Sequence, residues 1–209
     1  VANTYNTRVS LTGQDNLVDL NGTYKIADGN LDMNLDISRL NLKSIQGFTL
    51  DNLKESTGFF SGNFKISGNV DQPKVVGDLL FNDIGFKVTQ LNSTFKSLND
   101  KIVFTGNTIT FNHFIIKDEK DNDLDINGKI NTQNISNIGY DLTLDAVNFK
   151  AINSQEKDND LYYGEMYLDN HLRIGGTFNN PVVDGNIKVN KDTKFTIVMP
   201  QSDPSIADR

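Results

Sequence analysis

The sequence predicts an all-β, mostly antiparallel fold, and three observations lead to this prediction. Apolar residues alternate with polar ones along much of the chain, which is the pattern of a half-buried strand. Clusters of Gly, Asn, Asp and Pro separate these runs, and their backbone preferences favour tight turns. The same arrangement of strands and turns then occurs twice within the 209 residues. Short strands joined by tight turns favour an antiparallel meander.

The alternating runs locate the expected strands along the chain. They include residues 31–37, 64–66, 124–126, 140–144, 166–168 and 172–174. Turns are expected at residues 28–30, 106–107, 118–123, 179–181 and 191–192. Residues 40–45 and 50–55 can each form a helical turn, but neither keeps the spacing of a longer amphipathic helix. Residues 153–160 are polar and are expected to form a loop.

A repeated unit of about 107 residues accounts for nearly the whole chain. A motif of Ile, Gly, Pro and Gly with identical internal spacing occurs at two places 108 residues apart: Ile66, Gly68, Pro73 and Gly77, then Ile174, Gly176, Pro181 and Gly185. Residues 19–22 match residues 125–128 at a separation of 106, and residues 35–45 match residues 142–152 at 107. We therefore expect a first unit at residues 1–107 and a second at residues 108–209, continuous with the first.

Composition excludes several classes of function. The chain has 20 Lys and Arg against 27 Asp and Glu, a net charge of −7, so nucleic acid is a poor partner. Cysteine is absent, which excludes a disulfide scaffold and thiolate zinc sites. No apolar run approaches the roughly 20 residues that span a bilayer as a helix. The chain does not begin with Met, and we expect it to be part of a longer protein whose membrane contacts lie elsewhere.

The residues capable of chemistry predict no catalytic, metal or cofactor site, and we expect that the protein is not an enzyme. His113 and His171 lack a second ligand at short spacing and are expected at the surface or at a strand edge. The acidic run at residues 118–125 fails as a calcium loop, because a loop that starts at Asp121 has Ile126 where Gly is required. We expect this run to be a solvated turn.

Two architectures fit the pattern of strands. In a sandwich, two sheets press their apolar faces together. In an open, curved sheet, the apolar face lines a groove that another molecule fills. Periodicity alone does not separate the two, although a repeat that extends in one direction without closing favours the open sheet.

The second unit contains residues that resemble a known family. They are residues 148–153 (NFKAIN), residues 160–164 (DLYYG), the repeated Ile-Gly-Pro-Gly motif and residues 195–204 (FTIVMPQSDP). Together they resemble the C-terminal region of TamB, the translocation and assembly module subunit of the AsmA-like superfamily, in a form of the Bacteroidota type. The resemblance covers essentially the whole chain. It implies a β-taco, which is a long sheet folded into a trough with an apolar inside and a polar outside.

The same resemblance implies a role in the bacterial envelope. It implies a periplasmic protein anchored in the inner membrane, which moves phospholipid toward the outer membrane and assists outer-membrane protein biogenesis with a barrel partner of the TamA or BamA type. We expect this chain to be a hydrophobic-groove conduit for phospholipid acyl chains. The alternative is a client-binding sheet whose open edge templates outer-membrane protein strands by β-augmentation. The family implies no catalytic residues and no cofactor.

The alternation also gives the expected lining of the groove. Fifteen residues are expected to face inward: Met33, Leu35, Ile37, Phe64, Ile66, Leu79, Phe81, Leu124, Ile126, Leu142, Leu144, Leu172, Ile174, Ile187 and Val189. Six residues are expected to set turns or sheet curvature: Gly68, Pro73, Gly77, Gly176, Pro181 and Gly185. Roughly sixteen strands at a spacing of about 4.8 Å would give a groove of about 75 Å.

Overall fold

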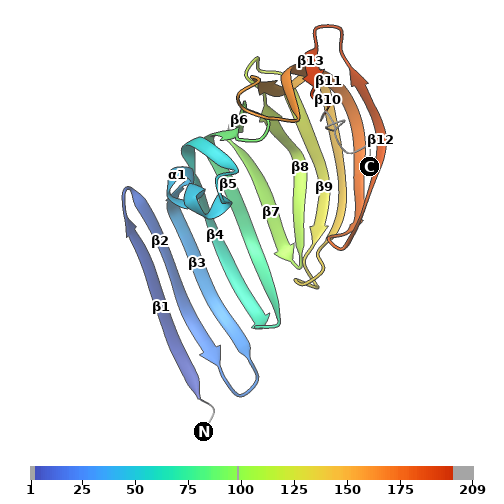
Figure 1. The fold of residues 1–209 in the computed structure, drawn as a ribbon. Coiled ribbons are helices and arrows are strands. Elements are labelled where there is room, and N and C mark those ends of the chain that lie inside the picture. Colours follow the sequence, from blue (N-terminus) through green and yellow to red (C-terminus); the bar gives the residue numbers. More distant parts are fainter. Residues whose placement is uncertain (1–2, 98, 200–209) are drawn as a thin grey trace, which may run out of the picture.

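One antiparallel sheet makes up almost the entire molecule. The computed structural model describes residues 3–97 and 99–199, and thirteen strands within them belong to this sheet (Figure 1). The all-β prediction is confirmed, and the open single sheet is observed instead of the sandwich. The described strands are fewer than the sequence suggested, because several of them are longer than the alternating runs.

Most of the strands follow one another as hairpins. Their bounds are β1 Thr4–Gly13, β2 Asn16–Lys25, β3 Asn30–Asn41, β4 Leu53–Asn69, β5 Gln72–Val88, β6 Ser93–Ser97, β7 Asp100–Gly106, β8 Thr108–Lys117, β9 Asp123–Asn131, β10 Gly139–Ser154, β11 Tyr162–Thr177, β12 Asn180–Val189 and β13 Lys194–Ile197. The helical elements α1 (Leu42–Ile45) and η1 (Gln46–Thr49) lie between β3 and β4. The helical turn expected at residues 50–55 is wrong, because Leu53 already pairs with Val88 of β5.

The strand order follows the sequence except near β6 and at the C-terminal edge. β7 pairs with both β5 and β8, while β6 pairs with the upper part of β5. β13 runs beside β11 beyond the end of β12. We call the end of the sheet that carries α1 and β6 the upper end, and the end with the β4–β5 hairpin the lower end (Figure 1). The sheet passes through residue 107 without interruption, and the division into units 1–107 and 108–209 stays a prediction.

Bulges bend several of the strands. The ladders shift register beside Asp83 in β5, His113 in β8 and Asn148 in β10, whose φ angles are 49°, 49° and 54°. Asp, His and Asn adopt this left-handed conformation more readily than most residues. The backbone N–H of His113 donates to the Asn127 side chain, and that of Asn148 donates to Asp169, each at 2.8 Å. These side chains replace the ladder bonds that the bulges remove.

The ladders correct the correspondence between the two units. Met33 pairs with Gly22, and Leu142 pairs with Gly128, so β3 and β10 correspond at a separation of 109 residues. The separation of 107 expected for these strands is wrong by two residues. A shift of two residues keeps every side chain on the same face of a strand, so the apolar pattern matches at either separation.

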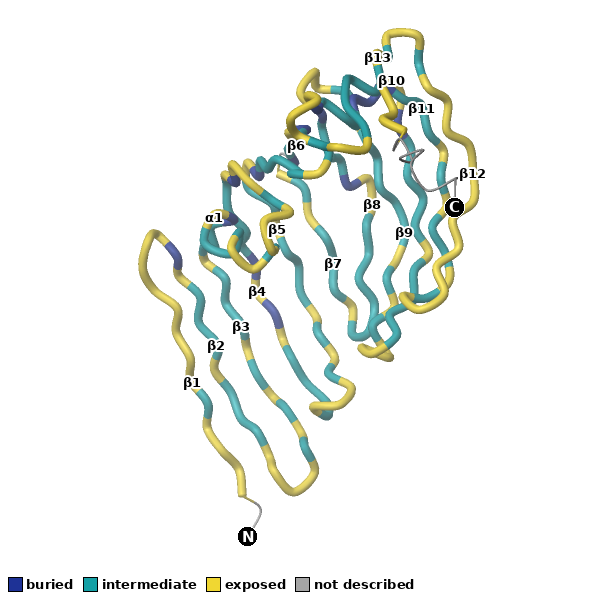
Figure 2. The backbone as a smooth tube through the Cα atoms, viewed as in Figure 1, coloured by how far each residue is buried: buried dark blue, intermediate teal, exposed yellow. Residues whose placement is uncertain are grey.

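Most of the buried residues lie toward the upper end of the sheet (Figure 2). Phe95, Ala146 and Phe149 form a buried cluster, against which pack Phe86, Val88, Leu91, Ile116, Leu124 and Ala151. Elsewhere most strand residues are only half-buried, and β1 and β12 are almost entirely exposed. The larger part of the apolar face is therefore not covered by the described part of the chain.

Candidate functional site

The pairing of the strands defines an inner face. Residues directly opposite each other in an antiparallel ladder point to the same side of the sheet. One row of direct partners crosses eleven strands without a charged side chain: Val9, Leu20, Leu35, Phe64, Gly77, Phe104, Ile109, Ile130, Tyr140, Gly176 and Pro181. We call the side to which this row belongs the inner face, and the row itself the central row.

The central row runs obliquely to the strand ends. It begins in the middle of β1 at Val9 and ends at Gly176 and Pro181, next to the turn between β11 and β12. Each later strand is therefore displaced upward relative to the earlier ones, and the strands climb from β1 to β12 in Figure 1.

All fifteen residues expected to line the groove lie on the inner face. The pairings place each of them in the central row or at an even number of residues from it along the same strand. Phe64 is buried, Ile187 and Val189 are exposed, and the other twelve are half-buried. That these residues contact a lipid stays a prediction.

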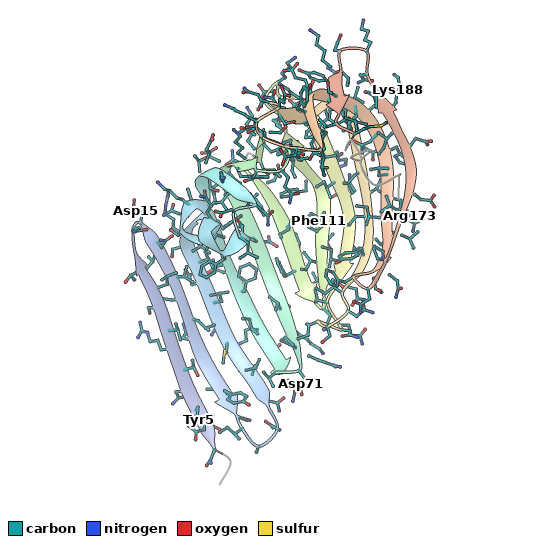
Figure 3. All side chains as sticks on the ribbon, in the orientation of Figure 1. Tyr5, Asp15, Asp71, Phe111, Arg173 and Lys188 are labelled. Atoms are coloured by element: carbon teal, nitrogen blue, oxygen red, sulfur yellow. The ribbon has the colours of Figure 1, made fainter. Side chains whose placement is uncertain are left out.

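The inner face is the concave face. Phe81 of β5 and Phe114 of β8 contact each other with ring centres 4.8 Å apart, although β7 pairs with both of their strands. Side chains from strands that are not neighbours meet on the side toward which a sheet curves. In Figure 3, Phe111 lies within this curve, whereas Arg173 and Lys188 extend from the outer side of β11 and β12.

The outer face carries pairs of charged residues. Lys101 donates to Asp78 between β7 and β5 at 2.9 Å, and Arg173 donates to Asp141 between β11 and β10 at 3.0 Å. Exposed pairs of this kind contribute little to stability. They give the outer face a hydrated surface, in contrast to the apolar inner face.

Four of the six residues expected at turns frame two hairpins. Gly68 pairs with Pro73 at the β4–β5 hairpin, and Gly176 pairs with Pro181 at the β11–β12 hairpin. The two glycines have φ angles of 92° and 83°, which few other residues adopt. The repeated motif therefore gives the same hairpin in both units.

The other two glycines of the motif, Gly77 and Gly185, lie inside β5 and β12. A Cβ atom at Gly185 would come within 2.1 Å of the carbonyl oxygen of His171. Their position permits a close approach of neighbouring strands rather than a turn.

The two histidines are exposed on the outer face, as expected. Nδ1 of His113 lies 2.8 Å from Oδ2 of Asp125, and Nδ1 of His171 lies 2.5 Å from Oδ1 of Asp145. Within residues 3–97 and 99–199, no three or more His, Cys, Asp or Glu side chains are placed to hold a metal ion. The histidines thus form pairs with single carboxylates.

The turn between β8 and β9 is not simply solvated. The Asp118 side chain is only 1% exposed, and it accepts hydrogen bonds from the backbone N–H groups of Lys120, Asn122 and Lys150 at 2.7 to 2.9 Å. The expectation of a solvated turn is wrong for Asp118. Lys150 lies 32 residues further along the chain, so local sequence gives no sign of this contact.

Glu119 of the same turn connects β6 to β10, and we call its contacts the Glu119 clasp. The carboxylate accepts hydrogen bonds from the Thr94 backbone N–H at 3.3 Å, from Asn153 Nδ2 at 2.9 Å and from Lys150 Nζ at 3.3 Å. Burial lowers the pKa of the Lys150 amine, but its hydrogen bonds to Glu165 and Glu119 outweigh this and raise the pKa above the ordinary value. Lys150 therefore stays charged and keeps the clasp closed.

Asp169 forms an acid-sensitive contact at the C-terminal edge. Its carboxylate accepts hydrogen bonds from Asn190 Nδ2 at 2.7 Å, from the Asn148 backbone N–H at 2.8 Å and from Lys188 Nζ at 3.1 Å. These bonds hold the pKa of Asp169 at about 2, below its ordinary value of 3.8. Because the folded pKa is the lower one, the stabilisation is present above about pH 4 and is lost as the pH falls toward about 2.

Asp169→Asn is therefore expected to lower the melting temperature at pH 7 by a few degrees and to leave it nearly unchanged near pH 2. Thermal unfolding followed by circular dichroism between pH 7 and pH 2 measures the difference. A difference that keeps its full size at pH 2 contradicts the assigned contact.

Several inner-face residues were not predicted from the sequence. They include Tyr5, Val9, Leu11, Leu20, Phe60, Phe104, Phe111 and Phe114. In β8, Phe111 and Phe114 both point inward although they are three residues apart, because the bulge at His113 inserts an extra residue. A search for strict alternation misses such pairs. An Asn or His within an apolar run is the sequence signal that could have indicated such a bulge.

An elongated, open sheet with a continuous apolar inner face and a charged outer face defines an all-β protein of the taco-like, open-groove class. A sequence model of the family described as TamB C-terminal domain matches residues 8–113 and again residues 112–208. The chain belongs to this family and contains two consecutive copies of its domain. The comparisons with curated proteins and with solved structures give no match.

The family gives the general biological setting. Its members are envelope proteins that act as transport and assembly modules and are not known enzymes, and membership implies an association with outer-membrane assembly machinery in general. Among the described residues, neither helical element has the length or the apolar character to cross a bilayer. Residues 200–204, at the end of the resemblance motif, lie outside the described residues.

Proposed function

We propose that the inner face is a conduit along which phospholipid acyl chains move across the periplasm toward the outer membrane. The central row carries this proposal, because it joins eleven strands by direct pairing and has no charged side chain. A chain lying along this row meets apolar atoms on every strand that it crosses.

The energetic need for such a face follows from the cost of hydrating hydrocarbon. Each CH₂ group exposed to water costs about 0.8 kcal/mol, so an acyl chain of about sixteen carbons meets a barrier on the order of 10 kcal/mol. Half-buried residues such as Leu35 and Leu142 still expose apolar surface that such a chain can cover. Lipid headgroups can remain in water on the open side of the sheet.

The length of the sheet suits gradual movement. Eleven strands at a spacing of about 4.8 Å extend over about 50 Å. A second unit in series lengthens the apolar path without any new kind of contact. We propose on this ground that residues 1–107 and 108–209 act as two successive sections of one conduit.

Photocrosslinking from the two faces of single strands tests the conduit. A photoreactive amino acid is placed at Leu35 and Leu142 on the inner face, and at the adjacent outer-face positions Asn34 and Thr143 as matched controls. The protein is produced with bacterial envelope lipid present, and lipid adducts are measured by mass spectrometry. Adducts at least tenfold more abundant at the inner positions support the proposal, and equal yields at both faces contradict it.

The open edges of the sheet favour a second candidate function. β1 pairs only with β2 among the described strands, and nine of its ten residues are exposed. An unpaired edge can add a strand from another chain through backbone hydrogen bonds. In this alternative, β1 templates strands of outer-membrane proteins, and crosslinks to client proteins form from outer-edge positions of β1 rather than from Leu35 and Leu142.

The proposed setting follows from the family. We place the protein in the periplasm, with an inner-membrane anchor in parts outside this chain and with an outer-membrane barrel partner of the TamA or BamA type. Co-purification of such a barrel with the full-length protein from envelope extracts tests the partner. If the same purification from extracts that lack the protein recovers equal amounts of the barrel, the proposed partner is contradicted.

A further inference from the structure

A strap crosses the inner face at the upper end of the sheet. The strap consists of residues 89–97, which form the turn after β5 and strand β6. Phe95 of the strap stacks on Phe149 of β10, with ring centres 5.6 Å apart and ring planes 4° apart. Phe95 belongs to the same buried cluster as Ala146, against which Leu124 packs. Leu124 and Ala146 are direct partners on the inner face, so the strap covers part of that face.

The first unit shows the same place without a strap. We call the row of Ile116, Leu124, Ala146, Asn170 and Ile187 the covered row, because its first three residues belong to the Phe95 cluster, although Ile187 at its far end is 60% exposed. The corresponding row in the first unit consists of Leu11, Val18, Ile37, Gly62 and Leu79. Ile37, which corresponds to Ala146, is half-buried, whereas Ala146 is only 6% exposed. The sheet therefore forms this row with or without a cover.

The two edges of the strap are fastened unequally. Five backbone pairs join β6 to the upper part of β5. On the other edge, a single ladder pair, Lys96 with Lys117, joins β6 to β8. The contacts to β10 are separate hydrogen bonds, such as that from the Asn153 N–H to the Leu91 carbonyl at 3.0 Å, together with the Glu119 clasp. Ser93 Oγ also donates to the Ala151 carbonyl at 3.1 Å, and Asn92 Nδ2 to the Asn153 carbonyl at 2.8 Å, so this edge is held mainly by side chains and has few backbone ladder bonds to break.

The bulge at Asp83 gives the strap a place to bend. It lies in β5 directly before the part that pairs with β6. The φ angle of Asp83 is 49°, and the neighbouring ladder with β4 is interrupted there. Gly85, Lys87 and Val88 above the bulge still pair with β4, so a bend at Asp83 moves the upper parts of β4 and β5 together with β6 while the lower ladder of β5 stays intact.

We propose that the strap is a displaceable lid, and that the row beneath it binds one acyl chain when Phe95 moves out. This inference rests on the proposed conduit and adds a control point within it. The covered row has no charged side chain, and its one amide, Asn170, donates from Nδ2 to the Leu144 carbonyl at 2.7 Å. Four of its five side chains are apolar, so hydrocarbon replaces the Phe95 ring with similar apolar contacts.

A reversible disulfide across the weaker edge tests the lid. Lys96 and Lys117 are direct antiparallel partners, and such residues have Cα atoms about 4.5 to 5.5 Å apart, within the range of a disulfide. The chain has no cysteine of its own, so Lys96→Cys with Lys117→Cys forms a single bond. Arg8→Cys with Asn21→Cys, a paired position between β1 and β2, is the matched control.

The probe is a photoactivatable palmitate analogue, and labelled peptides are identified by mass spectrometry. In the reduced strap variant, label is expected at Leu35 and at Leu124 or Ala146. Oxidation is expected to reduce the label at Leu124 and Ala146 at least tenfold, to leave Leu35 unchanged and to have no effect in the control pair. Equal label beneath the strap in both states, or none in the reduced state, overturns the inference.

Hydrogen exchange separates failure of the lid from failure of the conduit. The Asn153 amide, which donates to Leu91 of the strap, is expected to exchange at least tenfold more slowly after oxidation. Equal exchange in both states overturns the lid. Absence of label at Leu35 in every form contradicts the proposed conduit, whatever the exchange of Asn153 shows.

Discussion

Leu142→Asp is expected to reduce phospholipid transfer by at least tenfold while the sheet stays folded. Leu142 lies on the inner face of β10, where Gly128 and Ile174 are its direct partners. Because the residue is half-buried on an open face, water can hydrate the new carboxylate without unfolding the sheet. An acyl chain that passes it loses contact over about two CH₂ groups, or about 1.6 kcal/mol, which corresponds to more than tenfold.

Transfer between donor and acceptor phospholipid vesicles measures this effect, and circular dichroism checks the fold. Thr143→Asp is the matched control, because it adds the same charge one residue away on the outer face, opposite Asn127 and Arg173. Normal transfer is expected for this control. Loss of transfer in both variants, or in neither, contradicts the assignment of the conduit to the inner face.

Gly128→Ala is expected to destabilise the protein by about 3 kcal/mol or more. Gly128 lies in β9 between β8 and β10, with a φ angle of 126°. A Cβ atom there would come within 2.1 Å of the Asp141 carbonyl oxygen and within 2.9 Å of the Leu142 Cα atom. Both contacts are backbone atoms of a paired strand, so relief requires β9 and β10 to separate. Chemical denaturation gives the free energy of unfolding.

Gly13→Ala provides the matched control for backbone strain. Gly13 has a φ angle of 125°, almost the same as Gly128, but no atom lies within 4 Å of a Cβ placed there. The control is expected to lose only the stability that an unfavourable φ angle costs, about 1–3 kcal/mol. If both variants lose the same free energy of unfolding, the close approach of β9 and β10 contributes nothing to the destabilisation by Gly128→Ala.

The sequence indicates to which face of the sheet a side chain points wherever apolar and polar residues alternate without interruption. Leu35, Leu142 and Ile174 lie in such runs, and a period of two places each of them on the inner face even when the strand bounds are uncertain. The separation of 107 residues between β3 and β10 was wrong by two, and a shift of two residues leaves the predicted face unchanged. Alternation is therefore more informative about faces than about register.

The parts that the sequence did not predict depend on contacts between distant residues. Phe111 and Phe114 escape the alternation because of one bulge, and the role of Asp118 depends on Lys150 in another strand. The strap is a further case, since its sequence resembles that of any short strand. Its position over β10 follows from the Phe95 and Phe149 stack, which no local pattern encodes.

The upward displacement of successive strands has a geometric consequence for anything that travels along the sheet. The central row starts halfway up β1 and reaches the tip of the hairpin at Gly176 and Pro181, so it leaves the sheet at the far end. A cargo that stays midway between the upper and lower ends of the sheet must therefore pass from the row that contains Leu35 to the row that contains Leu144 and Leu172. If further units were added with the same displacement between strands, the opening of the trough would follow a helical path around its long axis.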